Sequence, residues 1–186
     1  MRKFCLSIAA SACFALAACA QVTNVPPTEL QAFEARTGTV IIMGAGQVGA
    51  VAVDNVNLSV ICKESTDVSG GPKQYGLAIE ILENNQRLSK LDVDSDELDS
   101  LLNGLNYLAK IDYNVTTLPT FVAAYVTKSG FRVGAYTSQR RGAIQYFVED
   151  SSRPGVRILL TPSQLAQFQT LIQEARKNLD SMRAAP

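Results

Sequence analysis

From residue 39 onward, apolar and polar side chains mostly alternate, which is the pattern of strands in an antiparallel sheet with one solvated face. Turn sequences rich in glycine, proline, asparagine or aspartate separate these runs, so the pattern predicts consecutive β-hairpins. In the first half we expect strand segments at residues 39–43, 51–53, 56–62, 77–81 and 88–93. In the second half we expect strands at residues 121–127, 131–137, 143–149 and 157–160.

Two segments carry the spacing of amphipathic helices. The first begins at Asp94, where Glu97 completes a capping box, and a stripe of leucines follows. The second begins at Thr161, with Pro162 at its first position and Gln164 in the matching place of the box. The expected buried stripes are Leu98, Leu101, Leu102, Leu105 and Leu108 in one helix, and Leu165, Phe168, Ile172, Ala175, Leu179 and Met182 in the other.

The two helix starts align without a gap, because residues 94–101 match residues 161–168 in their capping and apolar positions. Each start follows a predicted run of antiparallel strands. We therefore expect an α+β fold with two amphipathic helices, in which a unit of strands followed by a helix occurs twice, at about residues 39–112 and 120–183. Residues 29–186 are long enough to form one domain around its own core.

The N-terminus has the parts of an export signal. Arg2 and Lys3 precede an apolar run at residues 4–15, and small residues close it at 16–19. The run is shorter than the roughly 20 residues that a membrane-spanning helix needs. Residues 16–19, Leu-Ala-Ala-Cys, resemble the lipobox of bacterial lipoproteins, in which the cysteine receives the lipid and the signal is cut just before it.

That resemblance implies that Cys19 is acylated and becomes the first mature residue, after removal of residues 1–18. The next residue is alanine rather than the aspartate that retains such proteins at the inner membrane, so the resemblance implies an outer-membrane lipoprotein. The alternative is cleavage at a small-x-small motif around Cys19, which would release a soluble periplasmic or secreted protein. Residues 19–28, with adjacent prolines, are expected to form an extended tether ahead of a short helical turn at 29–36.

Composition narrows the expected chemistry. The chain has no histidine, so it lacks the usual general base, the commonest zinc ligand and the Ser-His-Asp arrangement. Removal of the signal leaves Cys62, within an apolar run, as a buried small side chain without a disulfide partner. Residues 19–119 carry 6 basic and 13 acidic side chains and residues 120–186 carry 9 and 4, so the halves differ in the sign of their charge. We expect a protein that is not an enzyme and needs no cofactor or metal.

Two motifs resemble ligand sites but lack part of the pattern. Residues 44–49 read Gly-Ala-Gly-Gln-Val-Gly, as in a dinucleotide-binding fingerprint, but no helix is predicted after them. We interpret them as a tight turn or β-bulge between two strands. Residues 92–97 resemble the start of a calcium loop, but Glu97 replaces the glycine at its sixth position and Asn103 the glutamate at its twelfth. We interpret these acids as helix-capping residues.

The last predicted strand and the helix start after it, residues 157–165, resemble those of positive-cofactor-type transcriptional coactivators. The repeated order of strands and helix is also similar to that of the Whirly proteins, which bind single-stranded DNA. This resemblance implies a binding face made by Lys128, Arg132, Tyr136, Arg140, Arg141 and Tyr146. Alternating exposure along a half-solvated strand also explains such residues, and an exported protein meets little single-stranded nucleic acid.

These inferences lead to one expectation for function. We expect an exported, lipid-anchored protein of the bacterial envelope with a non-catalytic binding or scaffolding role. Its expected partners are the membrane, through the lipid on Cys19, and either another envelope protein or a second copy of itself. A soluble periplasmic or secreted ligand-binding domain is the alternative, and a nucleic-acid-binding module is the less favoured one.

Overall fold

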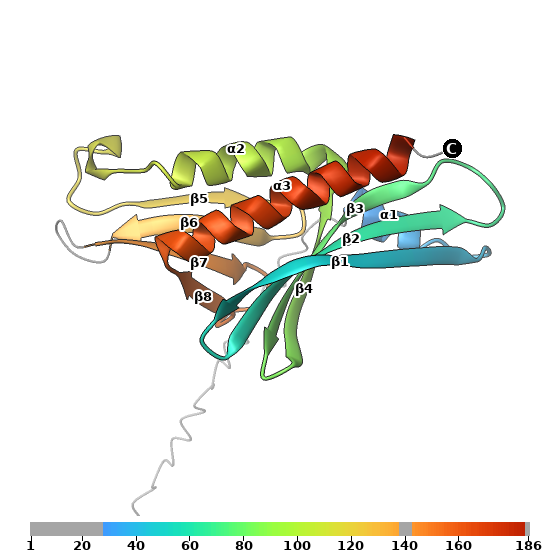
Figure 1. The fold of residues 1–186 in the computed structure, drawn as a ribbon, viewed down its shortest axis with the longest axis horizontal. Helices are drawn as coiled ribbons and strands as arrows, with labels where there is room; N and C mark the ends of the chain where they lie inside the picture. The colour runs from blue at the N-terminus through green and yellow to red at the C-terminus, as the bar shows by residue number, and fades with distance from the viewer. Residues whose placement is uncertain (1–27, 138–142, 185–186) are drawn as a thin grey trace, which may run out of the picture.

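In the computed structural model, which describes residues 28–137 and 143–184, two antiparallel sheets are each followed by a helix (Figure 1). The first sheet has the strand order β1 (Ile41–Val53), β2 (Val56–Asp67), β3 (Gln74–Glu83) and β4 (Gln86–Asp94). The second has the order β5 (Val122–Val126), β6 (Phe131–Thr137), β7 (Ile144–Asp150) and β8 (Arg157–Leu160). The expected α+β class is confirmed, and the unit of four strands and a helix does occur twice.

The helices begin where the capping signals place them. The described helices are α1 (Glu29–Glu34), α2 (Leu98–Leu108) and α3 (Pro162–Ala184), with short 3-10 turns η1 (Ser95–Glu97) and η2 (Tyr113–Val115). At the start of η1, which leads into α2, Glu97 accepts a hydrogen bond from the backbone N–H of Asp94 at 3.3 Å. Before α3, Thr161 accepts one from the N–H of Gln164 at 3.2 Å. Within the described residues, no helix combines the length and apolar character needed to span a membrane.

Each of the two longer helices covers the sheet of the other half. α2 packs against β5 and β6, whereas α3 packs against β1, β2 and β3 and crosses α2. Glycines mark two of these close approaches. A Cβ on Gly104 of α2 would lie 3.0 Å from Tyr125 of β5, and a Cβ on Gly49 of β1 would lie 2.6 Å from Leu171 of α3. The two halves have therefore exchanged their helices.

This exchange produces one continuous hydrophobic core. The leucine stripe of α2 is buried along its length, and the stripe of α3 is buried from Leu165 to Leu179. Met182, the expected continuation of this stripe, is instead 36% exposed near the end of α3. Phe131 of β6 and Phe168 of α3 are fully buried, with ring centroids 5.8 Å apart. Burying such apolar side chains contributes about 1.5–3 kcal/mol each to folding, so the helices stabilise both sheets at once.

The glycine-rich segment differs from the expectation. Residues 44–49 do not separate two strands but lie inside β1, which runs for 13 residues and pairs with β2 along its length. The expected bulge is present, between Gln47 and Gly49, whereas the expected break is not. After Val53 the chain turns at residues 54–55 into β2, so no helix follows that could present its N-terminus to a dinucleotide.

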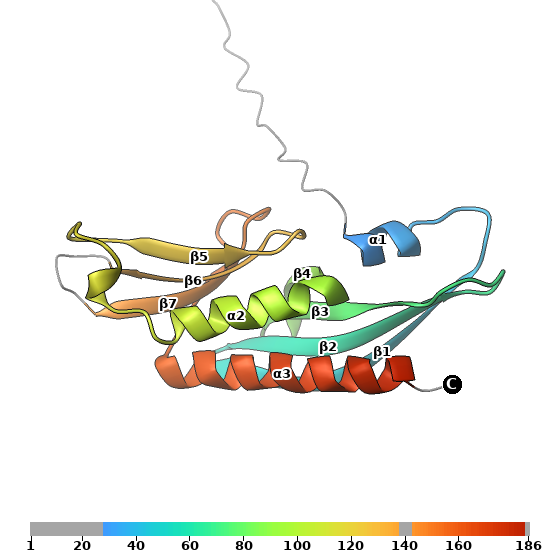
Figure 2. The same ribbon diagram turned by 90° about the horizontal axis from the view of Figure 1, so that it is seen from above.

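The first sheet carries helices on both faces. α1 packs on β2, β3 and β4, and Figure 2 shows α1 and α3 on opposite sides of this sheet. Leu30 and Phe33 are the buried residues of α1. The outer face of the second sheet has no helix over it in the described part of the chain (Figure 2).

Candidate functional site

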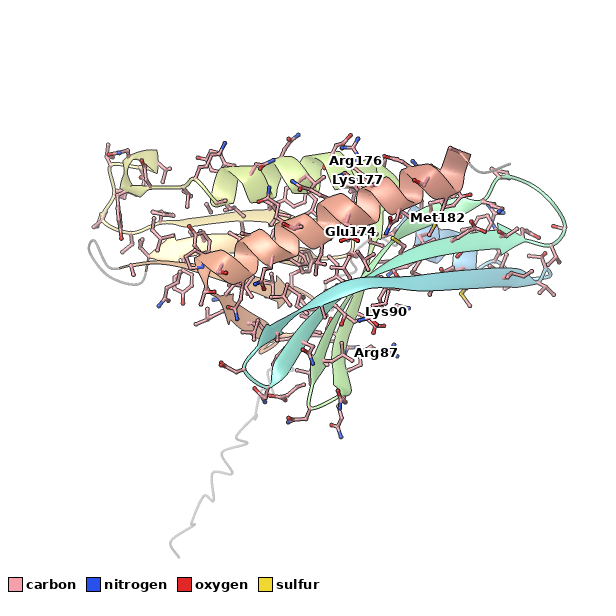
Figure 3. The ribbon with its side chains drawn as sticks, in the orientation of Figure 1. Arg87, Lys90, Glu174, Arg176, Lys177 and Met182 are labelled. Atoms are coloured by element: carbon pink, nitrogen blue, oxygen red, sulfur yellow. The ribbon has the colours of Figure 1, made fainter. Side chains whose placement is uncertain are left out.

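Four strands form the edges of the two sheets, and β1 differs from the other three. β4 carries Arg87, Lys90 and Asp92, the first two of which are labelled in Figure 3. β5 and β8 have only five and four residues. Short length and charged side chains are common protections of an edge strand against pairing with another chain. β1 has 13 residues, and residues 37–53 contain neither a charge nor a proline.

β1 is covered near its end and open near its start. Gln164 of α3 donates a hydrogen bond from Nε2 to the carbonyl oxygen of Ala52 at 2.9 Å. In contrast, every residue from 42 to 47 is exposed. The large apolar side chains exposed at this end are Val40 (62%), Ile42 (58%) and Met43 (61%). We call residues 40–47 the open edge.

Two glycines of the open edge are not explained by the packing of their own chain. A Cβ on Gly46 would meet no atom within 4 Å, and one on Gly44 would meet only the carbonyl oxygen of Glu64, at 3.7 Å. Neither has a positive φ. Elsewhere in the sheets, a Cβ would come within 2.6 Å of another atom at Gly49, Gly76 and Gly134. Because glycine weakens a strand by about 0.5–1 kcal/mol relative to alanine, unexplained strand glycines point to close approach by another molecule.

A shallow groove of about 300 Å³ lies beside the open edge, on the face covered by α3. It is lined by Gly44, Ala45, Gly46, Cys62, Glu64 and Met182. Figure 3 shows Met182 between the last turns of α3 and the sheet. Burial, and to a lesser degree the charge of Glu174, raise the pKa of the Cys62 thiol to about 11, so Cys62 forms a neutral wall and not a nucleophile. The Glu64 carboxylate binds Lys73 at 3.0 Å. The groove is therefore mainly apolar.

The opposite face of the first sheet is fastened to α1 by hydrogen bonds to its first turn. Thr28, which is fully buried, accepts a hydrogen bond from the N–H of Gln31 at 3.1 Å. The carboxylate of Asp94 accepts hydrogen bonds from the N–H groups of Glu29 and Leu30, at 2.8 and 3.0 Å. These bonds satisfy donors that a helix start leaves without an intrahelical partner. They fix the point at which the chain enters the domain.

A buried ion cluster fastens the other end of α1. Lys63 of β2 is 5% exposed, and its Nζ lies 2.7 Å from a carboxylate oxygen of Glu34 and 3.1 Å from one of Asp92. Ser65 donates a hydrogen bond to Glu34 at 2.8 Å, and Gln31 donates one to Asp92 at 3.1 Å. We call Gln31, Glu34, Lys63, Ser65 and Asp92 the α1 polar network. It holds α1 on the sheet, because every charged member has an opposite charge within 3.1 Å.

A groove of about 590 Å³ lies between α2 and α3. Arg176 lines it and forms ion pairs with Asp99 of α2 and with Asp180 of α3. Nearby, Gln169 donates a hydrogen bond to Asn106 of α2 at 2.7 Å. Figure 3 shows Arg176 and Lys177 together on α3. These contacts join the exchanged helices, so we assign them a structural role.

Of the described residues predicted to form a nucleic-acid face, the structure brings two together. Arg132 and Tyr136 lie on the outer face of the second sheet, next to Phe147. Tyr146 is 8% exposed and belongs to the core, and Lys128 lies in the turn between β5 and β6. Outside the described residues lie Arg140 and Arg141, and also the predicted lipidation site Cys19.

The two described cations of this predicted face, Lys128 and Arg132, bind carboxylates of the protein itself. Arg132 and Arg157 both contact Glu149, at 2.7 and 2.5 Å. Lys128 contacts Asp96 at 3.0 Å, and this hydrogen bond holds the pKa of Lys128 above its usual range. The arrangement differs from a row of free cations and stacking aromatics along a strand, which single-stranded nucleic acid requires.

The acidic residues 92–97 divide between two lysines. Asp92 contacts Lys63, whereas Asp94 and Asp96 both contact the Nζ of Lys128, at 3.3 and 3.0 Å, and Asp94 also binds the start of α1. Asp94 and Glu97 do take part in helix capping, as expected, although the carboxylate of Asp94 also serves α1. Among the residues that the structure describes, no group of three or more His, Cys, Asp or Glu side chains is placed to hold a metal ion.

Comparison with known proteins found no match among family models, curated proteins or solved structures. The sequence pattern does not reveal the open edge, because the glycines of residues 44–49 favour a tight turn or β-bulge between two strands and not one continuous edge strand. The absence of charge over residues 37–53 is the signal that could have identified it. The burial of Lys63 had no such signal, because an isolated lysine in an alternating strand normally faces solvent.

Proposed function

We propose that the protein is an exported lipoprotein of the bacterial outer membrane that binds a protein partner through the open edge, without catalysing a reaction. The observation that carries the binding role is an exposed, uncharged edge strand beside an apolar groove. In strand addition, main-chain hydrogen bonds to such an edge provide affinity, and neighbouring side-chain pockets provide specificity. The open edge supplies the main-chain hydrogen-bonding groups, and the groove supplies a pocket for side chains.

The lipobox-like residues 16–19 support an anchor at Cys19. A fully extended tether of residues 19–28 reaches at most about 35 Å, so the domain would stay close to the membrane surface. α1 follows directly, and its contacts with Asp94 and the α1 polar network join the tether to the first sheet. A force on the tether would therefore act on a fixed point of the domain.

Fractionation of envelopes tests the anchor. The unaltered chain is expected in the outer-membrane fraction, and Cys19→Ser is expected to lose that location. If both forms fractionate as soluble periplasmic protein, the anchor is wrong and the protein is the soluble alternative.

Crosslinking and pull-down from the same envelopes test the binding edge. Ile42→Lys places a charge on the open edge and is expected to abolish partner capture. Ala50→Lys is the matched control, because Ala50 is also exposed on β1 but lies beyond the open edge. Equal capture by the unaltered chain, Ile42→Lys and Ala50→Lys would show that the open edge is not the binding site.

A further inference from the structure

We propose that the occupant of the open edge is a second copy of this chain, with β1 paired antiparallel to β1 about a two-fold axis perpendicular to the sheet. The inference rests on the proposed function for the binding role of the edge and names its partner. One continuous sheet then runs through both copies, with both α3 helices on the same side. Such an interface is isologous, because the same surface of each copy meets itself.

The charge pattern of β1 favours self-pairing. When a strand pairs with its own copy, a charged side chain close to the axis faces the same charge on the second copy, which is destabilising. Residues 37–53 contain no charged side chain, so no such repulsion arises. β4, the opposite edge of the sheet, carries Arg87, Lys90 and Asp92 and lacks this property.

The order of large and small side chains is also self-complementary. Ile42, Gly44 and Gly46 share the α3 face, because they pair with alternate residues of β2. Residues paired between the copies lie on the same face of the sheet. The axis therefore lies midway between one residue and the same residue of the second copy. With the axis at Gly44, Ile42 lies opposite Gly46 of the second copy; with the axis at Met43, it lies opposite Gly44. Both registers fill the space beside a glycine that its own chain leaves empty.

The covered end of β1 does not interfere with this pairing. An axis at residue 43 pairs residues 40–46 of the copies and an axis at residue 44 pairs residues 40–48, whereas Gln164 contacts β1 at Ala52. So short a paired stretch buries less surface than a standard protein–protein interface, which buries about 1,600 Å². The dimer is therefore weak in dilute solution and is favoured when an anchor concentrates the copies at a membrane.

Cysteine crosslinking tests the pairing directly in the full chain. Met43→Cys and Gly44→Cys are produced in the exporting bacterium, the envelopes are oxidised, and dimers are counted on non-reducing gels. The residue on the axis faces its own copy at about 4.5–5.5 Å between Cα atoms, which a disulfide spans. One of the two variants is expected to give at least ten times more dimer than Ala50→Cys. Dimer yields no higher than in this control for either variant would overturn the proposal.

Analytical ultracentrifugation of the purified full chain in detergent gives a second, independent measurement. Ile42→Lys is expected to weaken the dimer at least tenfold and Ala50→Lys to leave it unchanged, with circular dichroism confirming that both fold. Equal dimerisation of both variants would count against the β1 interface. If Ile42→Lys abolishes capture of another envelope protein while no cysteine variant crosslinks, the edge binds a different partner. The self-pairing is then wrong and the proposed function stands.

Discussion

Replacing Lys63 by alanine tests the α1 polar network. The ammonium is buried and bridges two carboxylates, with the side chain of Glu34 17% exposed and that of Asp92 9% exposed. Removing one partner of a buried ion pair typically costs 3–5 kcal/mol, because the remaining charge stays away from water without compensation. Since Glu34 partly reaches solvent, we expect the lower end, about 3 kcal/mol. The midpoint of thermal unfolding should then fall by about 6–12 °C.

Urea unfolding of the Lys63→Ala variant provides the measurement, and Lys73→Ala is its matched control. Lys73 contacts Glu64 at 3.0 Å but is half exposed, so solvent screens the pair and its loss should cost far less stability than the loss of Lys63. Lys63→Met retains most of the aliphatic volume and removes only the charge. The Lys63→Met variant should lose nearly as much stability as Lys63→Ala. If Lys63→Ala is no less stable than Lys73→Ala, the argument from buried charge is wrong.

Four further outcomes are expected. Gly46→Ala should keep or raise the stability of the monomer, by up to about 1 kcal/mol, in chemical denaturation. Gly134→Ala should lower it by about 1–3 kcal/mol, because its Cβ would lie 2.5 Å from the Phe147 ring. Hydrogen bonds, from Ser69 above all, lower the pKa of Asp67 from 3.8 to about 2, so its stabilisation is complete above about pH 4 and disappears as the pH falls toward 2. Between about pH 4 and pH 2, the Asp67→Asn variant should therefore lose less stability than the unaltered protein, as measured by thermal melts. Cys62 should resist a thiol reagent at about pH 8 until urea unfolds the protein, and fast labelling of the folded protein in mass spectrometry would contradict its raised pKa.

The parts of the fold that the sequence predicts are those with local signals. Asn84 and Asn85 adopt positive φ in the turn between β3 and β4, a conformation that asparagine tolerates better than most residues. Phe131, Val133 and Ala135 are fully buried, whereas Arg132 and Tyr136, on the other face of β6, are half-buried. Each of these features depends on a few consecutive residues, so the pattern alone predicts it.

The exchange of helices between the halves has no local signal. Both sheets offer an apolar face and both helices offer an apolar stripe, so periodicity does not distinguish one pairing from the other. The choice depends on tertiary fit, such as the approach of Gly104 to Tyr125 and of Gly49 to Leu171. For the same reason, the sequence does not predict that β1 is one continuous strand. Pairing with β2 keeps residues 44–49 extended despite their glycines.

The exchanged helix also prepares β1 for pairing. Leu171 and Gln164 of α3 hold the second half of β1, while the α1 polar network supports the other face of β2, so the open edge extends from a rigid base. A preformed strand loses little conformational entropy on binding, which favours association. An unprotected edge of this kind would normally invite open-ended aggregation. Two-fold pairing avoids that outcome, because it covers both open edges at once and leaves the charged β4 strands at the outside of the combined sheet.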